Sequence, residues 1–427
     1  MKRLLACLFG LATFSLTLTA SAADWPQWRG PDRTGISPDT GLLKQWPKEG
    51  PPLLWKASNL GNGYSTPSVA DGQVYLQSNR GDKEYALALD AKTGKELWTT
   101  HIGKVGKNIG PQYPGTRSTP TVDGDRLYCL SSDGDLVCLD RPAGKERWRK
   151  NFKTDFEGAP GTWAYSESPL IDGETLVCTP GGKTATLLAL NKMTGDVIWK
   201  CALPAGDKAA YASAIVAQVG DIKQYIQFTH NGLVGVDAAA GKLLWRYTKT
   251  KDIAANIPTP VFHDGYVFSS AGRTGGGLAK LTVEKGGVTA TPVYFVKTMA
   301  NGIGGVVLVG DHLYGTTGLH LVCLEFATGK VKWQERSVAP GAVCYADGRI
   351  YVRGEKGEVV LVEATPEGYK EKGRFKQPDH GKIQAWPHPI IANGCLFLRD
   401  QGFVFCYDVR DKAASRAPSS FSVLGKR

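Results

Sequence analysis

The most regular pattern along the chain is a short apolar run, a tight turn and a second apolar run. Asp-Gly between two such runs is a strong β-hairpin signal, because a type I′ turn needs positive φ at both central residues. The turn recurs at intervals of roughly 40–50 residues, which is typical of β-propeller blades. The eight turns are Asp71-Gly72, Asp123-Gly124, Asp172-Gly173, Gly220-Asp221, Asp264-Gly265, Gly310-Asp311, Asp347-Gly348 and Asn393-Gly394.

A second hairpin follows the first in most repeats. Its first strand reads ALALD, LVCLD or a variant, and its second strand follows a turn such as TGK and ends in an aromatic residue. Four antiparallel strands per unit, repeated eight times, predict an all-β fold: an eight-bladed β-propeller of four-stranded blades. A Trp at one fixed place per blade indicates packing between blades and not a cofactor site. The aromatic residues are Trp98, Trp148, Trp199, Trp245 and Trp333, with Tyr294 in the fifth unit and Phe375 in the seventh.

The last repeat supplies only three strands before the chain leaves for its C-terminus. The run Pro52–Lys56 has the composition of a fourth strand, with Trp55, but has no blade of its own. We therefore expect this N-terminal strand to complete the last blade and to close the ring, which removes exposed sheet edges. The propeller would then cover residues 52–409 as one domain, and we expect a monomer.

The two ends of the chain differ from the repeats. Residues 1–22 have a basic head, an uncharged apolar run and a small-residue cleavage pattern, which predicts a signal peptide cut before Ala23. The apolar run is too short for a good membrane-spanning helix, so a periplasmic or secreted protein is expected. Residues 23–51 form an N-terminal extension. Residues 410–427 are basic, lack strand alternation and are expected to be disordered.

The charge and motif content excludes several function classes. The net charge is +11, which suits anionic partners of the cell envelope but is equally explained by solubility. The basic residues are spread over turns, and no aromatic and basic platform for nucleic acid is present. The seven His have no metal-ligand spacing. The run Gly181–Thr184 resembles the end of a P-loop but lacks its first glycine and the following helix.

Eight cysteines remain after removal of the signal segment, in a compartment that permits disulfides. Cys129 and Cys138 lie symmetrically about Asp133-Gly134. A two-residue turn there would make them a directly opposed, non-hydrogen-bonded pair, close enough for a disulfide. The alternative is that all eight are small core residues.

The turn and aromatic motif, [TA]-G-[KD]-x-x-W after an apolar [AV]-L-[DN] strand, resembles the repeat of the quinoprotein-like (PQQ-repeat) family over about residues 52–409. This resemblance implies the propeller fold but not an activity. The family includes quinone-dependent alcohol and glucose dehydrogenases, and a scaffold lipoprotein of the outer-membrane barrel-assembly machinery. The segment Asp24–Ser37 resembles the N-terminus of exported PQQ-like propellers, and we expect Trp25 and Trp28 to dock on the propeller surface.

In a propeller, the loops that lead into the first strand of each blade gather at one mouth of the central channel; we call them the mouth loops. Here they carry aromatic, acidic, basic and imidazole side chains, and loops often carry function. The alternative is that these residues only plug the channel. The candidate funnel residues are Tyr64, Arg117, Trp163, Tyr165, Glu167, Tyr211, Asn256, Trp386 and His388.

The resemblance raises the question of a dehydrogenase that binds PQQ with Ca²⁺. Glu167 and Asn256 lie on mouth loops where the family's enzymes place calcium ligands, and Arg117 could face a carboxylate of PQQ. The following blade reads NGIGG, with no Asp for a base, and the chain has no vicinal Cys pair and no CxxCH site. The preferred hypothesis is therefore a cofactor-free and metal-free binding or scaffold protein that holds an envelope protein, peptide or glycan. The PQQ-dependent dehydrogenase is the alternative.

Overall fold

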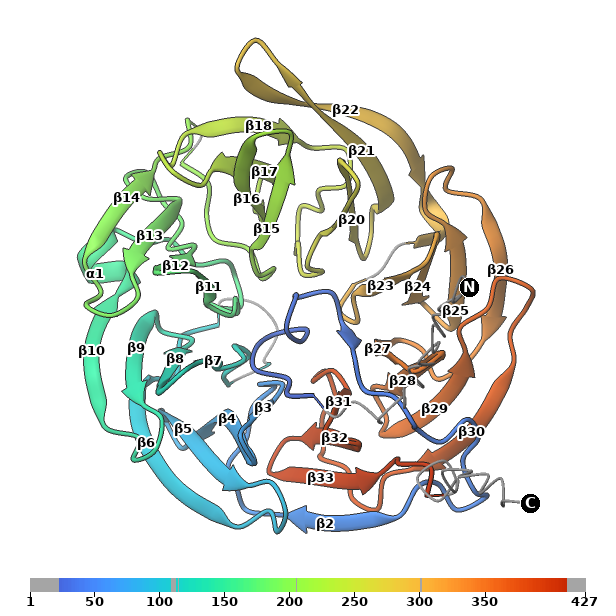
Figure 1. Ribbon diagram of the computed structural model, residues 1–427. Coiled ribbons are helices and arrows are strands. Elements are labelled where there is room, and N and C mark those ends of the chain that lie inside the picture. Colours follow the sequence, from blue (N-terminus) through green and yellow to red (C-terminus); the bar gives the residue numbers. More distant parts are fainter. Residues whose placement is uncertain (1–22, 109–112, 114, 205, 300–301, 413–427) are drawn as a thin grey trace, which may run out of the picture.

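The computed structural model describes residues 23–108, 113, 115–204, 206–299 and 302–412. The expected signal segment 1–22 and most of the expected tail, 413–427, lie outside these residues. The described chain forms eight antiparallel blades around a central channel (Figure 1), which confirms the predicted eight-bladed β-propeller.

The blades follow one another around the ring in chain order. Blade 1 has β3 (Ser68–Ala70), β4 (Gln73–Arg80), β5 (Lys83–Asp90) and β6 (Glu96–Lys104). Blade 2 has β7 (Thr121–Asp123), β8 (Arg126–Leu130), β9 (Asp135–Asp140) and β10 (Glu146–Asn151). Blade 3 has β11 (Leu170–Asp172), β12 (Thr175–Cys178), β13 (Leu187–Asn191) and β14 (Val197–Cys201). Blade 4 has β15 (Ile215–Val219), β16 (Ile222–Thr229), β17 (Gly232–Asp237) and β18 (Leu243–Tyr247).

The second half of the ring repeats this arrangement. Blade 5 has β19 (Val261–His263), β20 (Tyr266–Ala271), β21 (Gly275–Glu284) and β22 (Gly287–Val296). Blade 6 has β23 (Val306–Val309), β24 (His312–Thr317), β25 (His320–Glu325) and β26 (Val331–Arg336). Blade 7 has β27 (Gly341–Ala346), β28 (Arg349–Gly354), β29 (Glu358–Glu363) and β30 (Glu371–Lys376). Blade 8 has β31 (Ile390–Ala392), β32 (Cys395–Asp400), β33 (Phe403–Asp408) and the N-terminal strand β2 (Leu53–Ala57).

Helix is a minor part of the fold. The helix α1 (Phe152–Phe156) follows β10 and is capped by Asn151, whose side chain accepts hydrogen bonds from two backbone N–H groups. A 3₁₀ turn, η1 (Lys297–Met299), follows β22. Among the residues described, no helix has the length and apolar character needed to cross a membrane.

The ring closes as the sequence predicts. Strand β2 pairs antiparallel with β33, with Trp55 opposite Cys406 and Lys56 opposite Phe405. The first and last parts of the propeller are therefore held in one sheet. In each of blades 1 to 7, the four blade strands are consecutive in the chain.

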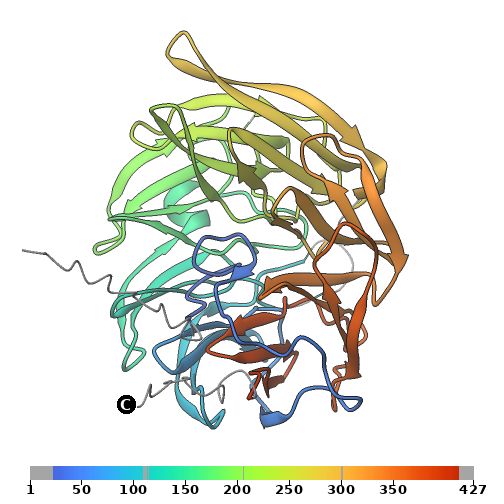
Figure 2. The ribbon, with the colours of Figure 1, turned by 45° about the vertical axis from the view of Figure 1, so that its right-hand side comes forward.

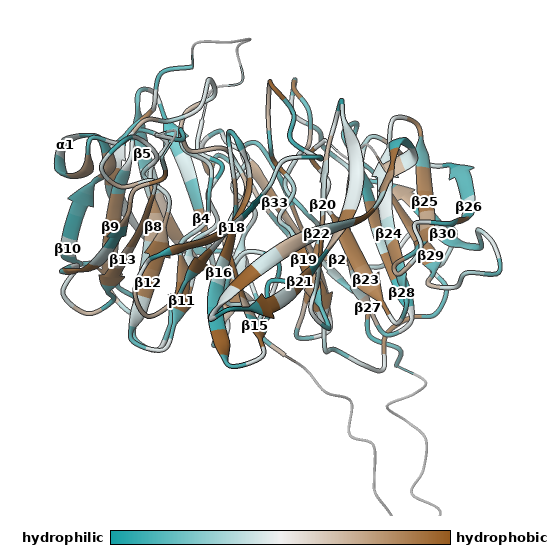
Figure 3. Cartoon of the chain, turned by 90° about the horizontal axis from the view of Figure 1, so that it is seen from above, coloured by the Kyte–Doolittle hydropathy of each residue, from teal (hydrophilic) through white to brown (hydrophobic). Residues whose placement is uncertain are grey.

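Hydrophobic residues fill the spaces between blades. Viewed from the side, outer strands such as β10 and β26 are mainly hydrophilic, whereas the neighbouring β9 and β25 are hydrophobic (Figure 3). All four central residues of β9 and of β25 are buried. This pattern is expected when each sheet packs both faces against neighbouring blades and exposes its last strand.

The repeated aromatic residue and the repeated turn glycine form one device. The indole of Trp98 donates to the carbonyl of Arg141 in the next blade at 3.0 Å. Its ring lies over Gly144, where a Cβ would come within 2.6 Å of the ring, and Gly144 has a φ of +67°. The turn therefore needs glycine both for its backbone conformation and for the approach of the ring. The same contact joins Trp55 to Gly94, Trp148 to Gly195, Trp199 to Gly241 and Tyr294 to Gly329.

The first hairpins use two turn types, so the expectation of type I′ turns throughout is wrong for half of them. Both central residues have positive φ at Asp71-Gly72, Asp264-Gly265, Asp347-Gly348 and Asn393-Gly394. In the other four, the glycine is the first central residue and alone has positive φ, as in a type II′ turn. Either type suits the strand twist, and the position of the glycine selects between them.

The N-terminal extension is more deeply placed than expected. We call residues 23–39 the leader. It lies in the central channel (blue in Figures 1 and 2), and Trp25 is buried at 1% exposure. Its strand β1 (Ile36–Ser37) pairs in parallel with β27 and makes blade 7 five-stranded. The expectation that Trp25 and Trp28 dock on the propeller surface is therefore wrong in position, because both lie toward the axis of the ring.

The leader contacts every blade. Backbone hydrogen bonds join Trp25 to Val69 in blade 1 and Pro26 to Val122 in blade 2. Side-chain bonds join Arg33 to carbonyls at the starts of blades 3 and 4, Trp28 to Thr259 before blade 5, and Arg29 to Val306 in blade 6. Strand β1 contacts blade 7, and Asp39 accepts from the N–H of Gly394 in blade 8. The leader thus connects the inner ends of all eight blades.

The proposed disulfide geometry at Cys129 and Cys138 is not observed. The connection between β8 and β9 pairs Leu130 with Leu136, so Cys129 faces Val137 and Cys138 faces Tyr128. The turn contains one residue more than expected, which shifts the register by one and turns the two side chains to opposite faces of the sheet. The thiols are free and lie in different hydrophobic clusters.

Candidate functional site

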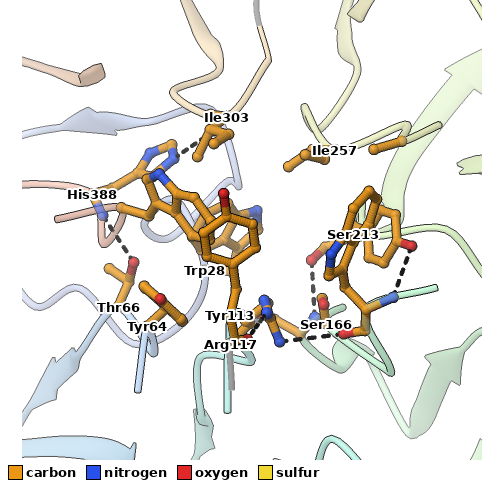
Figure 4. Close-up of a pocket in the computed structure, with 15 residues that line it drawn as sticks. Trp28, Tyr64, Thr66, Tyr113, Arg117, Ser166, Ser213, Ile257, Ile303 and His388 are labelled. Atoms are coloured by element: carbon orange, nitrogen blue, oxygen red, sulfur yellow. Dashed lines mark hydrogen bonds between the residues drawn. The ribbon is translucent and has the colours of Figure 1, made fainter. Parts of the chain in front are cut away.

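The mouth loops and the leader enclose a pocket of about 320 Å³ on the axis of the ring (Figure 4). This volume is within the range of about 300–1,000 Å³ that is usual for small-ligand sites. Six of the nine candidate residues line it: Tyr64, Arg117, Trp163, Tyr211, Trp386 and His388. They come from the mouth loops of blades 1, 2, 3, 4 and 8.

Six aromatic side chains form most of the wall, because Trp28 from the leader and Tyr113 also line the pocket. The rings of Tyr64 and Trp386 are 4.7 Å apart and inclined by 31°, and Trp386 also contacts Tyr113 at 4.8 Å. A second contacting pair, Trp163 and Tyr211, has ring centres 5.7 Å apart and planes inclined by 56°. The rings therefore pack on one another as two inclined groups, and their faces and edges are available to a ligand.

Arg117 is the charged side chain of the wall. It donates through Nη1 to the carbonyls of Gly115 (2.9 Å) and Trp163 (3.2 Å), and through Nη2 to the carbonyl of Tyr113. Its guanidinium also lies 5.4 Å from the centre of the Tyr64 ring. Burial lowers the pKa of Arg117, but an arginine stays charged at neutral pH. Among the described residues, no carboxylate forms an ion pair with it.

The hydroxyl groups of the wall are arranged as donors. The side-chain oxygens of Thr66, Ser168 and Ser213 accept backbone N–H bonds at 2.9–3.0 Å from His388, Thr119 and Ser168 respectively. Each hydroxyl proton then remains to be donated. Two further hydroxyls, Tyr64 Oη and Ser166 Oγ, are buried and have no hydrogen-bond partner among the described residues. Burial raises the pKa of Tyr64 to about 12, so its hydroxyl keeps its proton at neutral pH.

His388 is a neutral part of the wall. Burial, and then the nearby charge of Arg29, lowers the pKa of His388 to about 3. Its ring packs edge-on against Trp28, with the ring centres 4.6 Å apart. Its Nε2 lies 3.4 Å from the carbonyl oxygen of Ile303. His388 therefore contributes shape and a neutral ring to the pocket, without positive charge.

The other three candidates are placed away from the pocket. Tyr165 is buried against Phe152 and donates to the carbonyl of Pro180 at 2.9 Å. Glu167 accepts from the N–H of Thr179 and from Gln227 Nε2, and burial raises its pKa to about 7. Asn256 accepts from the N–H of Asp252 at 2.8 Å and donates to the carbonyl of Thr229 at 2.9 Å. These side chains fix the mouth loops.

Glu167 and Asn256 were the calcium-ligand candidates, and their oxygen atoms already accept hydrogen bonds from the protein. In the part of the chain that the structure describes, no group of three or more His, Cys, Asp or Glu side chains is placed to hold a metal ion. No Asp or Glu stands among the described residues of the pocket wall.

Sequence reasoning missed six residues of the wall with clear chemistry: Trp28, Thr66, Tyr113, Ser166, Ser168 and Ser213. The serines follow from the mouth-loop motif, since they stand within a few residues of the first strand of blades 3 and 4, as Thr66 does in blade 1. Trp28 lies outside the repeats, so no periodic position predicts it.

Curated relatives of this chain have several activities. A segment of 163 residues is 28% identical to a quinoprotein ethanol dehydrogenase of Pseudomonas aeruginosa, covering 36% of this chain and 25% of that enzyme. A tetrathionate hydrolase of Acidithiobacillus ferrooxidans is 22% identical over 244 residues, with coverages of 52% and 44%. The outer membrane protein assembly factor BamB of Moranella endobia is 28% identical over 262 residues, with coverages of 55% and 61%. The chain thus spans less than two thirds of each relative.

Solved structures support the fold. The quinohemoprotein alcohol dehydrogenase of Comamonas testosteroni superposes with a TM-score of 0.64 at 14% identity, covering 95% of this chain and 83% of the enzyme. At this identity the likeness concerns the fold alone. A family model described as outer membrane protein assembly factor BamB matches residues 32–104, 82–335 and 295–369. Since these matches run through most of the propeller, the chain belongs to this family of PQQ-repeat propellers.

Proposed function

We propose that this protein is an exported binding protein of the cell envelope and that it holds its ligand, or a group of a larger partner, in the pocket on the ring axis. The observation that carries the proposal is the composition of the pocket wall. Six aromatic rings, one arginine and two unpartnered buried hydroxyls converge on one cavity. Buried polar groups without partners cost stability, and a bound ligand is a direct way to satisfy them.

Export is supported by the pattern of residues 1–22, which has the features of a cleaved signal peptide. The family description and the relatives named outer membrane protein assembly factor BamB are consistent with an envelope location. A role in assembling outer-membrane proteins stays a proposal of lower rank, because the chain spans only part of those relatives.

The dehydrogenase alternative requires a site that suits PQQ with calcium. Calcium needs several hard oxygen ligands, whereas Glu167 and Asn256 are committed to loop hydrogen bonds and lie outside the wall. PQQ carries three carboxylates, and the wall offers the single cation Arg117. The rings within each contacting pair are inclined, by 31° for Tyr64 and Trp386 and by 56° for Trp163 and Tyr211, so neither pair presents one continuous flat face to a flat ring system. The residues do not fit this cofactor.

The proposal is tested by capture. Immobilised protein is incubated with a polysaccharide fraction and a membrane-protein fraction of the envelope, and the retained material is quantified. The triple variant Arg117→Ala, Trp163→Ala, Trp386→Ala should retain at least ten-fold less ligand than the native protein. The matched control changes Leu97, Arg147 and Ile198 to Ala, which are exposed on the outer strands β6, β10 and β14, and it should retain the ligand fully.

Equal retention by the pocket variant and the control would place binding elsewhere on the surface and would refute the proposal. A parallel incubation with PQQ and Ca²⁺, followed by gel filtration, should leave no PQQ absorbance with the protein. Retained absorbance together with reduction of an artificial electron acceptor would restore the dehydrogenase alternative.

A further inference from the structure

The wall of the pocket is rich in donors, and this restricts the ligand. The hydroxyls of Thr66, Ser168 and Ser213 accept backbone N–H bonds and keep their protons for donation. Tyr64 Oη and Ser166 Oγ are buried and unpartnered among the described residues. No Asp or Glu of the wall competes for these protons. The ligand should therefore carry several acceptor oxygens.

Arg117 adds a charge requirement. Three of its N–H groups donate to the carbonyls of Gly115, Trp163 and Tyr113. A guanidinium has five N–H donors, so two remain for a ligand. The carbonyl bonds fix the plane of the guanidinium before any ligand arrives, which reduces the cost of ordering it on binding. A planar guanidinium with two available N–H groups suits one carboxylate.

The aromatic side chains of the wall indicate the shape and polarity of the main part of the ligand. The five rings of Tyr64, Tyr113, Trp163, Tyr211 and Trp386 line the cavity, and those that contact one another are inclined. Such walls make contacts with apolar C–H faces, and the cavity of about 320 Å³ admits one or two rings. A body that is apolar on its faces and covered with oxygen acceptors at its edges is a sugar ring.

From these three features we infer that the pocket binds a sugar unit that carries one carboxylate, as in a uronate of an acidic polysaccharide. The carboxylate is placed against Arg117, the ring against Trp163 and Trp386, and the ring oxygens toward the hydroxyls of Tyr64 and Ser166. The inference rests on the proposed binding function and specifies the ligand class of the same pocket.

Calorimetric titration with uronate oligosaccharides tests the inference, and neutral oligosaccharides of the same length and linkage serve as the matched ligands. The panel is oligogalacturonate and oligoalginate against galacto- and manno-oligosaccharides. The native protein should bind at least one uronate member at least ten-fold more tightly than its neutral counterpart. That preference should fall as salt rises, because the contact is ionic.

Variants assign the charge contact. Arg117→Gln should remove the preference by lowering uronate affinity at least ten-fold while leaving affinity for the neutral sugar within three-fold. Arg117→Lys keeps the positive charge but not the planar pair of N–H donors, and it should retain an intermediate preference for the uronate. Trp163→Ala should weaken both sugars alike. Circular dichroism of each variant confirms that it is folded.

The outcomes separate the ligand class from the binding function. Equal affinity for uronate and neutral sugars, or an unchanged preference in Arg117→Gln, overturns the acidic-sugar assignment and leaves the binding function standing. No binding to any panel member, with pocket-dependent capture of envelope protein, also overturns the assignment and directs the proposed function to a protein ligand. If pocket-dependent capture is lost as well, both proposals fail.

Discussion

Arg33 in the leader and Arg117 in the pocket wall illustrate two ways of placing an arginine on the axis of the ring. Arg33 is 3% exposed and uses all five of its N–H donors within the protein. Its Nε binds Gln27 at 2.9 Å, and its two terminal nitrogens bind the carbonyls of Ser168, Pro169 and Ala214. Arg117 is more exposed and uses three donors, with inclined aromatic rings and unpartnered hydroxyls beside it.

The difference distinguishes packing from binding. A side chain that only closes the channel gains most when every polar atom is satisfied inside the protein. The leader meets this condition at Arg33. Burial lowers the pKa of the Arg33 guanidinium to about 9, and the nearby charge of Glu167 acts in the opposite direction. The pocket leaves donors of Arg117, Tyr64 and Ser166 without partners among the described residues. The same axis thus has a structural part, the leader, and a part prepared for a ligand.

The largest effect is expected from removing Arg33. Arg33→Ala removes the guanidinium that binds the buried carbonyls of Ser168 and Ala214, while the carbonyl of Pro169 keeps its bond from Thr121. It also breaks the contact of the leader with blades 3 and 4, so the free energy of unfolding should fall by about 4 kcal/mol. Arg117→Ala, whose carbonyl partners lie nearer to solvent, should cost about 1–2 kcal/mol. Urea unfolding followed by circular dichroism measures both.

Arg147→Ala is the control for this pair, because Arg147 makes an exposed ion pair with Asp140, which should contribute under about 1 kcal/mol. A loss in Arg117→Ala as large as that in Arg33→Ala would remove the distinction between the two sites. Arg117 would then be a packing residue, and the main argument that the pocket binds a ligand would fail.

Much of the fold could be predicted because it is repeated. Each Asp-Gly or Gly-Asp turn, each turn glycine and each aromatic residue recurs, so an error in one blade is corrected by the others. Closure by β2 followed from the missing strand of the last repeat. The mouth loops stand at a fixed place in the repeat, which is why Tyr64, Arg117 and Trp386 were correctly expected near one another.

The features that were missed are those without a repeat. The leader occurs once, and its course depends on the positive φ of Arg29 and Arg33 and on their long side chains. The register between Cys129 and Cys138 depends on one extra turn residue. Glu167 and Asn256 were assigned to the right loops, but the direction of a loop side chain is set by tertiary hydrogen bonds that no spacing shows.

An intermediate effect is expected from the pH dependence of Glu167, the carboxylate near Arg33. Burial raises its pKa from 4.5 to about 7, so the folded protein binds a proton more tightly than the unfolded chain. Its contribution to stability is complete at low pH and is lost as pH rises from about 4.5 through 7. Between pH 5 and pH 8, native protein should lose about 2–3 kcal/mol relative to Glu167→Gln, apart from any constant cost of the substitution.

Urea unfolding of both proteins across this pH range measures the difference in slope, in which the effects of other titrating groups cancel. Glu363→Gln is the control, because Glu363 is partly exposed and its pKa is lowered by contacts with lysines. That variant should not reproduce the change in slope between pH 5 and pH 8. Parallel stability curves for native protein and Glu167→Gln would mean that Glu167 stays charged in the fold and that the attraction of the Arg33 charge outweighs burial.

The smallest effect on stability is expected at Tyr64, together with a moderate loss of affinity for the ligand. Its hydroxyl is buried without a partner among the described residues, so Tyr64→Phe should leave the free energy of unfolding within about 1 kcal/mol of native or raise it, because a desolvation cost is removed. Affinity for the uronate ligand should nevertheless fall about five-fold, since the loss of one hydrogen bond costs about 1 kcal/mol.

Tyr165→Phe is the matched control. The Tyr165 hydroxyl donates to the carbonyl of Pro180 at 2.9 Å, so its loss should lower the free energy of unfolding by about 1 kcal/mol without changing affinity. If Tyr64→Phe instead lowers the free energy of unfolding and leaves affinity unchanged, the Tyr64 hydroxyl stabilises the fold. The contrast between the leader and the pocket then does not extend to this residue.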